Sequence, residues 1–237
     1  MPHWVIVPAA GIGARMGSAI PKQYMTLGSR TVLEQTLHRL ARLPGLAGMV
    51  VALHPQDEYW PRVQLPMAVP VMVCDGGSQR SQSVSNALQT LHGHAQEDDW
   101  VLVHDAVRPC VRIADIMALM DAIEGHAGGG LLAVPVSNTL KRSNDAGNVD
   151  ATVSRTDIWQ ALTPQAFRLG QLRSALAAAE RTGESITDEA SALELVGMAP
   201  RLVRGSADNI KITYPEDLVL AELILEAQRL EPLRTSD

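Results

Sequence analysis

Residues 9–24, AAGIGARMGSAIPKQY, have the composition of a loop that binds a bulky anion. The segment holds three glycines and two cations: Gly11, Gly13, Gly17, Arg15 and Lys22. Glycines let the backbone approach a ligand closely, and the two cations neutralise negative charge. The apolar run at residues 4–7 is typical of a buried strand. A strand that leads into such a loop favours phosphate binding, and we expect a nucleoside triphosphate.

Two familiar phosphate-binding loops do not fit this segment. A dinucleotide loop has the spacing GxGxxG, whereas the third glycine here, Gly17, comes one position late. A Walker loop reads GxxxxGK followed by Ser or Thr, and that string is absent. On spacing alone, a glycine-rich turn with surface charges remains an alternative, and the later motifs have to decide.

A second polar segment follows the strand-like run at residues 69–74. It reads DGGSQRSQSV and supplies Asp75, Gly76 and Ser83 at the start of an expected helix. Backbone groups and hydroxyls of this kind suit recognition of a base and a ribose. An ordinary helix cap by one of the other serines is the simpler explanation of this motif when it is taken alone.

The third polar segment, HDAVRP, follows the strand-like run at residues 100–103. Asp105 at the carboxyl end of a parallel strand can hold Mg²⁺ directly or through water. It would face the loops that follow the other strands. We interpret the neighbouring His104 as a hydrogen-bonded structural residue, and assign it no catalytic role.

Strands and helices that alternate along the chain predict an α/β fold. Residues 31–43 read as an amphipathic helix that Thr31 can cap, and Pro215 opens the last helix. We also predict a turn at 163–165, a helix over 186–194 and a strand over 208–213 with Lys211 at its middle. Residues 137–156 read as a hairpin with too few apolar residues to bury a core, which favours an arm that packs on another subunit.

Composition restricts the function further. The 237 residues carry a net charge of −6, which argues against a broad basic surface for nucleic acid. No stretch is apolar enough for a membrane helix and no signal pattern opens the chain. Cys74 and Cys110 have no metal-site spacing, and we expect reduced thiols in a cytoplasmic protein.

Five motifs occur in one order: AAGIGARMG with PKQY, DGGSQRSQSV, HDAVRP, ITDEASALE, and DNIKIT with PEDL. Together they closely resemble the 2-C-methyl-D-erythritol 4-phosphate cytidylyltransferase family over residues 5–218. The resemblance implies one Rossmann-like, mostly parallel α/β domain over residues 1–230, with a protruding β-arm at 137–156 and a frayed tail at 231–237. It also implies a homodimer, whose arms complete the partner's site.

The implied reaction transfers a cytidylyl group from CTP to methylerythritol phosphate, with Mg²⁺ as the cofactor and Asp105 as its ligand. The resemblance places triphosphate contacts on Ala9, Ala10, Gly11, Gly13, Arg15 and Lys22. It places base and ribose contacts on Asp75, Gly76, Ser83 and Ala106. Contacts to the sugar phosphate fall on Arg108, Thr139, Thr163, Thr187 and Lys211, and on Arg155 across the dimer.

Charge explains why such a site uses cations and needs no general base. The attacking phosphate has a second pKa of about 6 and is already largely ionised at neutral pH. Catalysis then rests on positioning and on neutralising two anions. Two alternatives remain: a cytidylyltransferase for another alditol phosphate such as ribitol phosphate, and a protein that binds CTP without catalysis.

Overall fold

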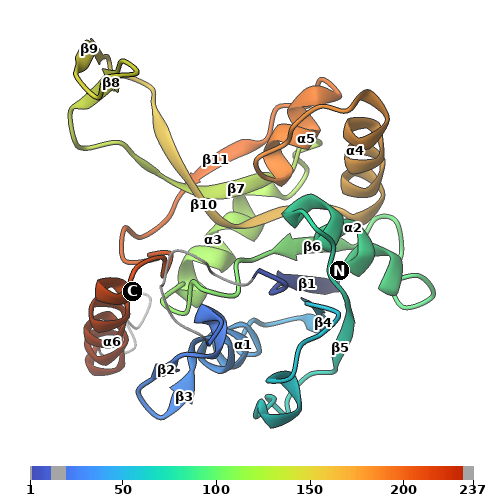
Figure 1. Ribbon diagram of the computed structural model, residues 1–237. Coiled ribbons are helices and arrows are strands. Elements are labelled where there is room, and N and C mark those ends of the chain that lie inside the picture. The colour runs from blue at the N-terminus through green and yellow to red at the C-terminus, as the bar shows by residue number, and fades with distance from the viewer. Residues whose placement is uncertain (1, 12–19, 232–237) are drawn as a thin grey trace, which may run out of the picture.

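The computed structural model describes residues 2–11 and 20–231, and its centre is a seven-stranded sheet (Figure 1). Its strands are β1 (His3–Pro8), β4 (Leu46–Leu53), β5 (Val71–Asp75), β6 (Trp100–Val103), β7 (Gly130–Pro135), β10 (Trp159–Arg168) and β11 (Arg201–Arg204). Their order across the sheet is β11-β7-β10-β6-β1-β4-β5. Only β10 runs antiparallel to its neighbours, β6 and β7. The mostly parallel sheet confirms the predicted α/β class.

Helices bury both faces of this sheet. They are α1 (Val32–Leu40), α2 (Arg80–Thr90), α3 (Ile113–Ile123), α4 (Leu169–Thr182) and α5 (Glu189–Leu195). The last helix, α6 (Pro215–Leu230), packs in a separate apolar cluster. Val5 and Val7 of β1 join a core with α1 and α3, whereas Trp4 and Ile6 join one with α2, α4 and α5. Successive side chains of a strand point to opposite faces, so a continuous apolar run fits a strand that is covered on both sides.

Short elements complete the described part of the chain. They are η2 (Lys22–Tyr24), β2 (Thr26–Leu27), β3 (Arg30–Thr31), η3 (Trp60–Arg62), β8 (Leu140–Ser143) and β9 (Val149–Val153). Thr31 caps α1 as predicted, because its side chain accepts from the N–H of Glu34 while Glu34 accepts from the N–H of Thr31. In the described residues, no helix is long and apolar enough to cross a membrane.

The predicted hairpin over residues 137–156 is present. β8 and β9 pair antiparallel and lie away from the central sheet, at the end of the two chain segments that leave β7 and enter β10 (Figure 1). Most of its side chains are exposed. We call residues 137–156 the arm.

Three predicted elements differ from the structure, two in type and one only in where it begins. Residues 163–165 do not form a turn but lie inside β10, where Gln165 pairs with Val103 of β6 and with Leu131 of β7. A shift of register between Ala161 and Gln165 accommodates Pro164, which has no N–H to donate. The predicted helix over 186–194 begins only at Glu189, since Asp188 is its cap.

Residues 208–213 do not form the predicted strand either. The segment is irregular, and its backbone bonds to the loop after β6 instead of to a sheet edge: Ile212 donates to the Val107 carbonyl at 2.9 Å. Its Asn209 side chain is buried and donates to the Thr163 carbonyl at 2.7 Å. Ile212 itself packs with α6 residues in a third apolar cluster. These contacts hold the segment in place without strand pairing.

Candidate active site

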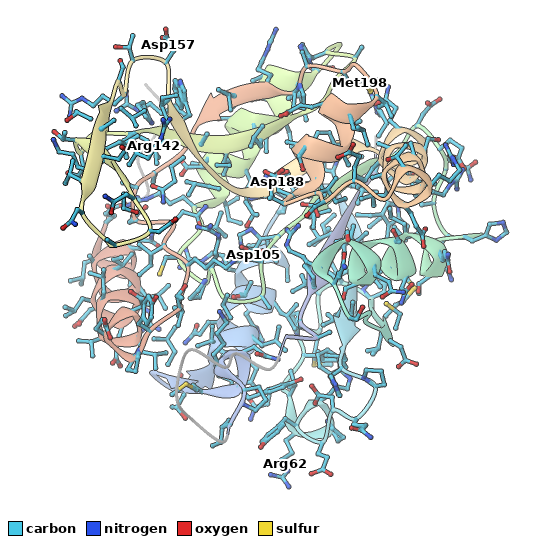
Figure 2. All side chains as sticks on the ribbon, turned by 45° about the horizontal axis from the view of Figure 1, so that its top comes forward. Arg62, Asp105, Arg142, Asp157, Asp188 and Met198 are labelled. Atoms are coloured by element: carbon cyan, nitrogen blue, oxygen red, sulfur yellow. The ribbon has the colours of Figure 1, made fainter. Side chains whose placement is uncertain are left out.

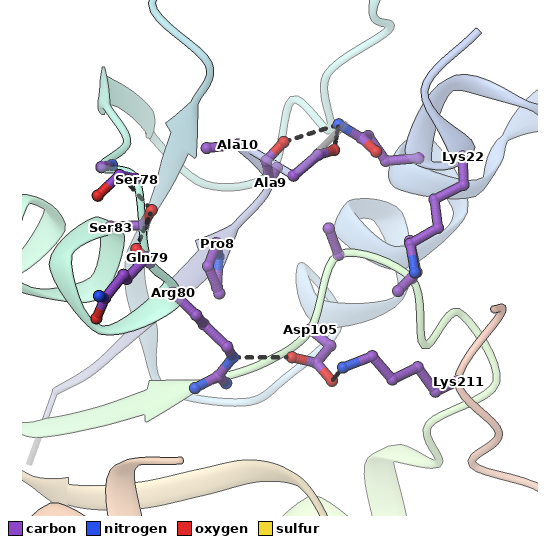
Figure 3. A pocket seen from close by; sticks show the side chains of 15 residues that line it. Pro8, Ala9, Ala10, Lys22, Ser78, Gln79, Arg80, Ser83, Asp105 and Lys211 are labelled. Atoms are coloured by element: carbon purple, nitrogen blue, oxygen red, sulfur yellow. Dashed lines mark hydrogen bonds and ion pairs between the residues drawn. The ribbon is translucent and has the colours of Figure 1, made fainter. Parts of the chain in front are cut away.

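The carboxyl ends of β1, β5 and β6 meet at one edge of the sheet, and a cavity of about 230 Å³ lies there (Figure 3). It is lined by Pro8, Ala9, Ala10, Gly11, Lys22, Gln23, Gly77, Ser78, Gln79, Arg80, Ser83, Asp105, Ala106, Val107 and Lys211. All three polar segments that the sequence singled out after strands thus converge on one cavity, as parallel strands require. Gly13 and Arg15 lie outside the described residues.

The start of the glycine-rich loop is fixed by the buried side chain of Gln23. Its Nε2 donates to the Ala9 carbonyl at 2.8 Å and to the Gly11 carbonyl at 3.1 Å. The N–H of Ala9 donates back to Ala52 of β4 at 2.8 Å, so the loop leaves the sheet directly after Ala9. Gln23 was part of the recognised PKQY motif, but its role was not predicted.

Lys22 reaches the cavity from the short helix η2. Its Nζ donates to the Ile212 carbonyl at 3.1 Å. The same helix is anchored by Tyr24, whose hydroxyl donates to Asp57 at 2.7 Å and whose ring stacks on Tyr59. The ammonium therefore stands between the glycine-rich loop and the irregular segment that carries Lys211.

The second wall of the cavity comes from the segment after β5. Gly76 has to be glycine, because a Cβ there would collide with the Cβ of Ala10. Ser83 accepts from the N–H of Gly77 at 3.0 Å and donates to the Gln79 carbonyl at 3.2 Å, which holds the turn against α2. Asp75 is exposed at the end of β5.

Asp105 stands at the centre of a cluster of cations. One carboxylate oxygen accepts from Arg80 Nε at 3.3 Å, and the other contacts Lys211 Nζ at 3.0 Å (Figure 3). The second oxygen also contacts Arg108 Nε at 3.1 Å. Burial alone would raise the pKa of Asp105, but the charges of Arg80, Lys211 and Arg108 hold it well below its usual range. Asp105 is therefore ionised at neutral pH and draws three cations to one place.

Arg80 also pairs with a second acid, Glu189 at the start of α5. Glu189 is only 1% exposed, and one of its carboxylate oxygens has no hydrogen-bond partner among the described atoms. Burial raises the pKa of Glu189, and the Arg80 charge opposes that shift. Neither residue was predicted as part of the site, although both lie in the motifs that were recognised.

A chain of buried hydrogen bonds holds the backbone of Asp105 in place. Thr163 Oγ1 accepts from the Asp105 N–H at 3.1 Å and lies 3.1 Å from Nδ1 of His104. Nε2 of His104 lies 3.0 Å from the Arg108 carbonyl, and burial lowers the pKa of His104 to about 4. A neutral, fully buried imidazole agrees with the structural role predicted for it. The Ala106 carbonyl accepts from Thr36 of α1 at 2.9 Å.

The remaining predicted residues lie outside this cavity. Thr187 is exposed and lines a smaller cavity of about 40 Å³, which Arg80 and Glu189 also line. Thr139 and Arg155 are exposed at the base of the arm, where Arg155 donates to the Ser137 carbonyl. Side chains on the arm, such as Arg142, lie far from Asp105 in the same chain (Figure 2).

Among the described residues, no group of three His, Cys, Asp or Glu side chains could hold a metal ion. The site still fits Mg²⁺, since this ion is often held by one or two carboxylates together with substrate phosphates and water. Asp105 supplies one ionised carboxylate beside the glycine-rich loop. Lys211, whose side chain is 40% exposed, is the partner that can most easily yield its place to a cation.

Comparison with known proteins gives one consistent result. The sequence profile of the family described as 2-C-methyl-D-erythritol 4-phosphate cytidylyltransferase matches residues 3–227. A protein of that name from Hahella chejuensis is 53% identical over 94% of this chain and 92% of its own. One from Vibrio parahaemolyticus is 48% identical over 96% of this chain and 97% of its own. The Francisella tularensis crystal structure of that name is 39% identical, with a TM-score of 0.82 over 94% of this chain and 100% of that one.

Proposed function

This chain belongs to the 2-C-methyl-D-erythritol 4-phosphate cytidylyltransferase family, whose members are enzymes of the non-mevalonate isoprenoid pathway, and we propose how its residues transfer the cytidylyl group. The observation that carries the proposal is the cavity at the strand ends, where a glycine-rich loop faces Lys22, Arg80 and Lys211. Such a set of donors suits a reaction between two anions.

In the proposed reaction, a phosphate oxygen of methylerythritol phosphate attacks the α-phosphorus of CTP. The bond from that phosphorus to the oxygen bridging to the β-phosphate breaks, and pyrophosphate leaves with the electron pair. The acceptor phosphate is largely ionised at neutral pH, so no side chain has to remove a proton. That agrees with His104, which precedes Asp105, being buried and neutral at pH 7.

CTP is placed by the walls after β1, β5 and β6. We assign the triphosphate to Ala9, Ala10, Gly11 and Lys22, together with Gly13 and Arg15. We assign the cytosine and ribose to Asp75, Gly76, Ser83 and Ala106. The close approach of Gly76 to Ala10 supports this division, because it brings the two walls against each other. Mg²⁺, held by Asp105 and the triphosphate, would supply positive charge at the reacting phosphate.

The acceptor lies on the other side of Asp105 in this proposal. Lys211 supplies the main positive charge, and Thr187 supplies a hydroxyl from the neighbouring small cavity. Thr163 and Arg108 act from below Asp105, where both are buried. Thr139 and Arg155 act from the arm.

We further propose that residues 1–230 form one nucleotidyltransferase domain and that the arm reaches a second copy of the chain. The distance of the arm from its own cavity and its exposed side chains support this assignment. On this view Arg155 completes the partner's site, and the enzyme is a homodimer. The free thiols of Cys74 and Cys110 agree with the proposed cytoplasmic location.

The test is pyrophosphate release from CTP and Mg²⁺ with methylerythritol phosphate, run beside ribitol phosphate as the rival acceptor. We expect pyrophosphate release with methylerythritol phosphate and none with ribitol phosphate. The opposite result would support the cytidylyl transfer but reject methylerythritol phosphate as the acceptor. A folded protein that binds CTP but releases no pyrophosphate with either acceptor would favour a non-catalytic CTP-binding protein.

A further inference from the structure

We propose that Gln23 is a positioning residue for the triphosphate, and that it acts by turning the carbonyl groups of the glycine-rich loop away from the ligand. The proposal rests on the function proposed above, in that the cavity takes CTP. It concerns a side chain to which the resemblance assigned no role.

The first step of the argument is the contact itself. One nitrogen, Gln23 Nε2, donates to the carbonyls of both Ala9 and Gly11. Gln23 is only 3% exposed, and its bond to Ala9 is buried, whereas its bond to Gly11 is partly buried. A buried amide that bridges two carbonyls of a neighbouring loop fixes the orientation of two peptide groups at once.

The second step follows from the planar trans peptide bond. The carbonyl of Ala9 and the N–H of Ala10 belong to one peptide unit and point in opposite directions. Since the carbonyl faces Gln23, the N–H of Ala10 faces away from it, and Ala10 lines the cavity. Within the described residues, the N–H of Ala10 has no hydrogen-bond partner. The Gly11 carbonyl shares its peptide unit with the N–H of residue 12, which lies outside the described residues.

The third step is electrostatic. A carbonyl oxygen that faced the cavity would repel a triphosphate, whereas a peptide N–H attracts it. By holding two carbonyls on its own side, Gln23 leaves the loop with donors for phosphate oxygens. Because Gln23 follows Lys22 on η2, the same residue also ties the helix that bears the ammonium to the loop.

The experiment measures equilibrium binding of CTP and of CMP, with Mg²⁺ and without acceptor, to the full chain and to Gln23→Met and Gln23→Glu. Gln23→Met keeps the length and fills the buried space but donates nothing, while Gln23→Glu also repels the carbonyls. We expect the Kd for CTP to rise about tenfold or more in both, as the loss of one or two donor bonds implies. The Kd for CMP, which lacks two of the three phosphates, changes far less.

Gln35→Met is the matched control. Gln35 Nε2 donates to a single carbonyl, that of Leu27 at 2.9 Å, and does not line this cavity. We expect its CTP affinity to equal that of the wild type. Wild-type CTP affinity in Gln23→Met would overturn the proposal. An equal loss for CTP and CMP would overturn it too, since it would reduce Gln23 to a support of the fold.

Failure of the proposed reaction can be distinguished from failure of the proposed role of Gln23. A wild-type chain that binds CTP but releases no pyrophosphate with any acceptor would reject the reaction. The binding comparison between Gln23→Met and the wild type would still decide the role of Gln23.

Discussion

The side chains around Asp105 show how an acidic protein can build a site for anions. One buried carboxylate holds Arg80, Arg108 and Lys211 within 3.3 Å, although the whole chain carries a net charge of −6. Cations that repel one another thereby share a small volume before any ligand arrives. In the proposed reaction, a ligand phosphate would meet donors that are already in place, which lowers the reorganisation needed during reaction.

Lys22 is expected to act on the reacting triphosphate rather than on the fold. We predict that Lys22→Ala lowers kcat by about 10²–10³, the usual effect of losing one charge-stabilising donor. The measurement is steady-state pyrophosphate release, with the melting temperature checked in parallel. Arg204→Ala, at an exposed position on β11, is the control. A turnover rate equal to the wild type in Lys22→Ala would contradict the assigned role, and the same prediction holds for Arg15→Ala.

The stability contributed by Asp105 depends on pH in a defined direction. Its folded-state pKa lies below the unfolded value of about 4, so the contribution is complete above that pH and is lost as the pH falls through the folded pKa. We predict that Asp105→Asn lowers the free energy of unfolding by about 3 kcal/mol at pH 7. The difference from the wild type should shrink as the pH is lowered below about 4.

Urea unfolding of the apoprotein between neutral and acidic pH measures this difference. Asp98→Asn, at an exposed position, is the matched control. A constant gap between Asp105→Asn and the wild type across the whole range would show that the loss does not come from the carboxylate charge.

Sequence reasoning found residues that follow strands and missed those that act through other residues. Asp105 and Lys22 stood in positions where charge pointed to a ligand, whereas the role of Lys211 came only from the family resemblance. Gln23 and Glu189 are buried, and their partners come from segments whose approach no local pattern encodes. Arg80 was not singled out either, because its contact to Glu189 spans 109 residues of sequence.

At the scale of elements, the buried strands and long helices followed from their apolar patterns, since burial on both faces leaves continuous runs. Two segments next to the site did not follow. β10 contains Thr163 and Pro164, which read locally as a turn, and pairing with β6 and β7 overrides that preference. The segment with Lys211 alternates like a strand, yet buried Asn209 and the bond from Ile212 to Val107 hold it as a loop.

The cap of α5 links an element to the site. Asp188 accepts from the N–H of Ser191 at 3.0 Å and from Gln165 Nε2 at 2.8 Å. We predict that Asp188→Ala lowers the free energy of unfolding by about 1–2 kcal/mol, as the loss of a cap does. Because Thr187 precedes this cap, the KM for methylerythritol phosphate should rise as well.

Thr31→Ala is the comparison for this prediction. Thr31 caps α1 in the same manner, and we expect a similar loss of stability measured by urea unfolding. Its KM for methylerythritol phosphate should remain that of the wild type. Equal KM values in the two variants would show that the start of α5 does not contribute to acceptor binding.

At the scale of the whole molecule, the proposed dimer predicts that two inactive variants can restore each other. Arg155→Ala removes the arm's contribution, and Lys22→Ala removes a donor in the body. After subunit exchange, a mixed dimer has one site with both residues intact, so some pyrophosphate release should return.

Mass spectrometry of differently tagged subunits verifies the exchange before activity is measured. A mixture of either variant with itself is the control and should stay inactive. If verified mixed dimers show no recovery, Arg155 does not act across the interface.

The arm is continuous with two inner strands of the sheet rather than attached to its rim. β7 and β10 pair beside each other, and pairing extends outward to the bond from the Val136 N–H to the Ile158 carbonyl at 3.0 Å. From Ile158, β10 runs inward to Thr163, whose hydroxyl holds the backbone of Asp105. One continuous strand therefore connects the end of the arm with the backbone of Asp105, and the register shift between Ala161 and Gln165 lies along it.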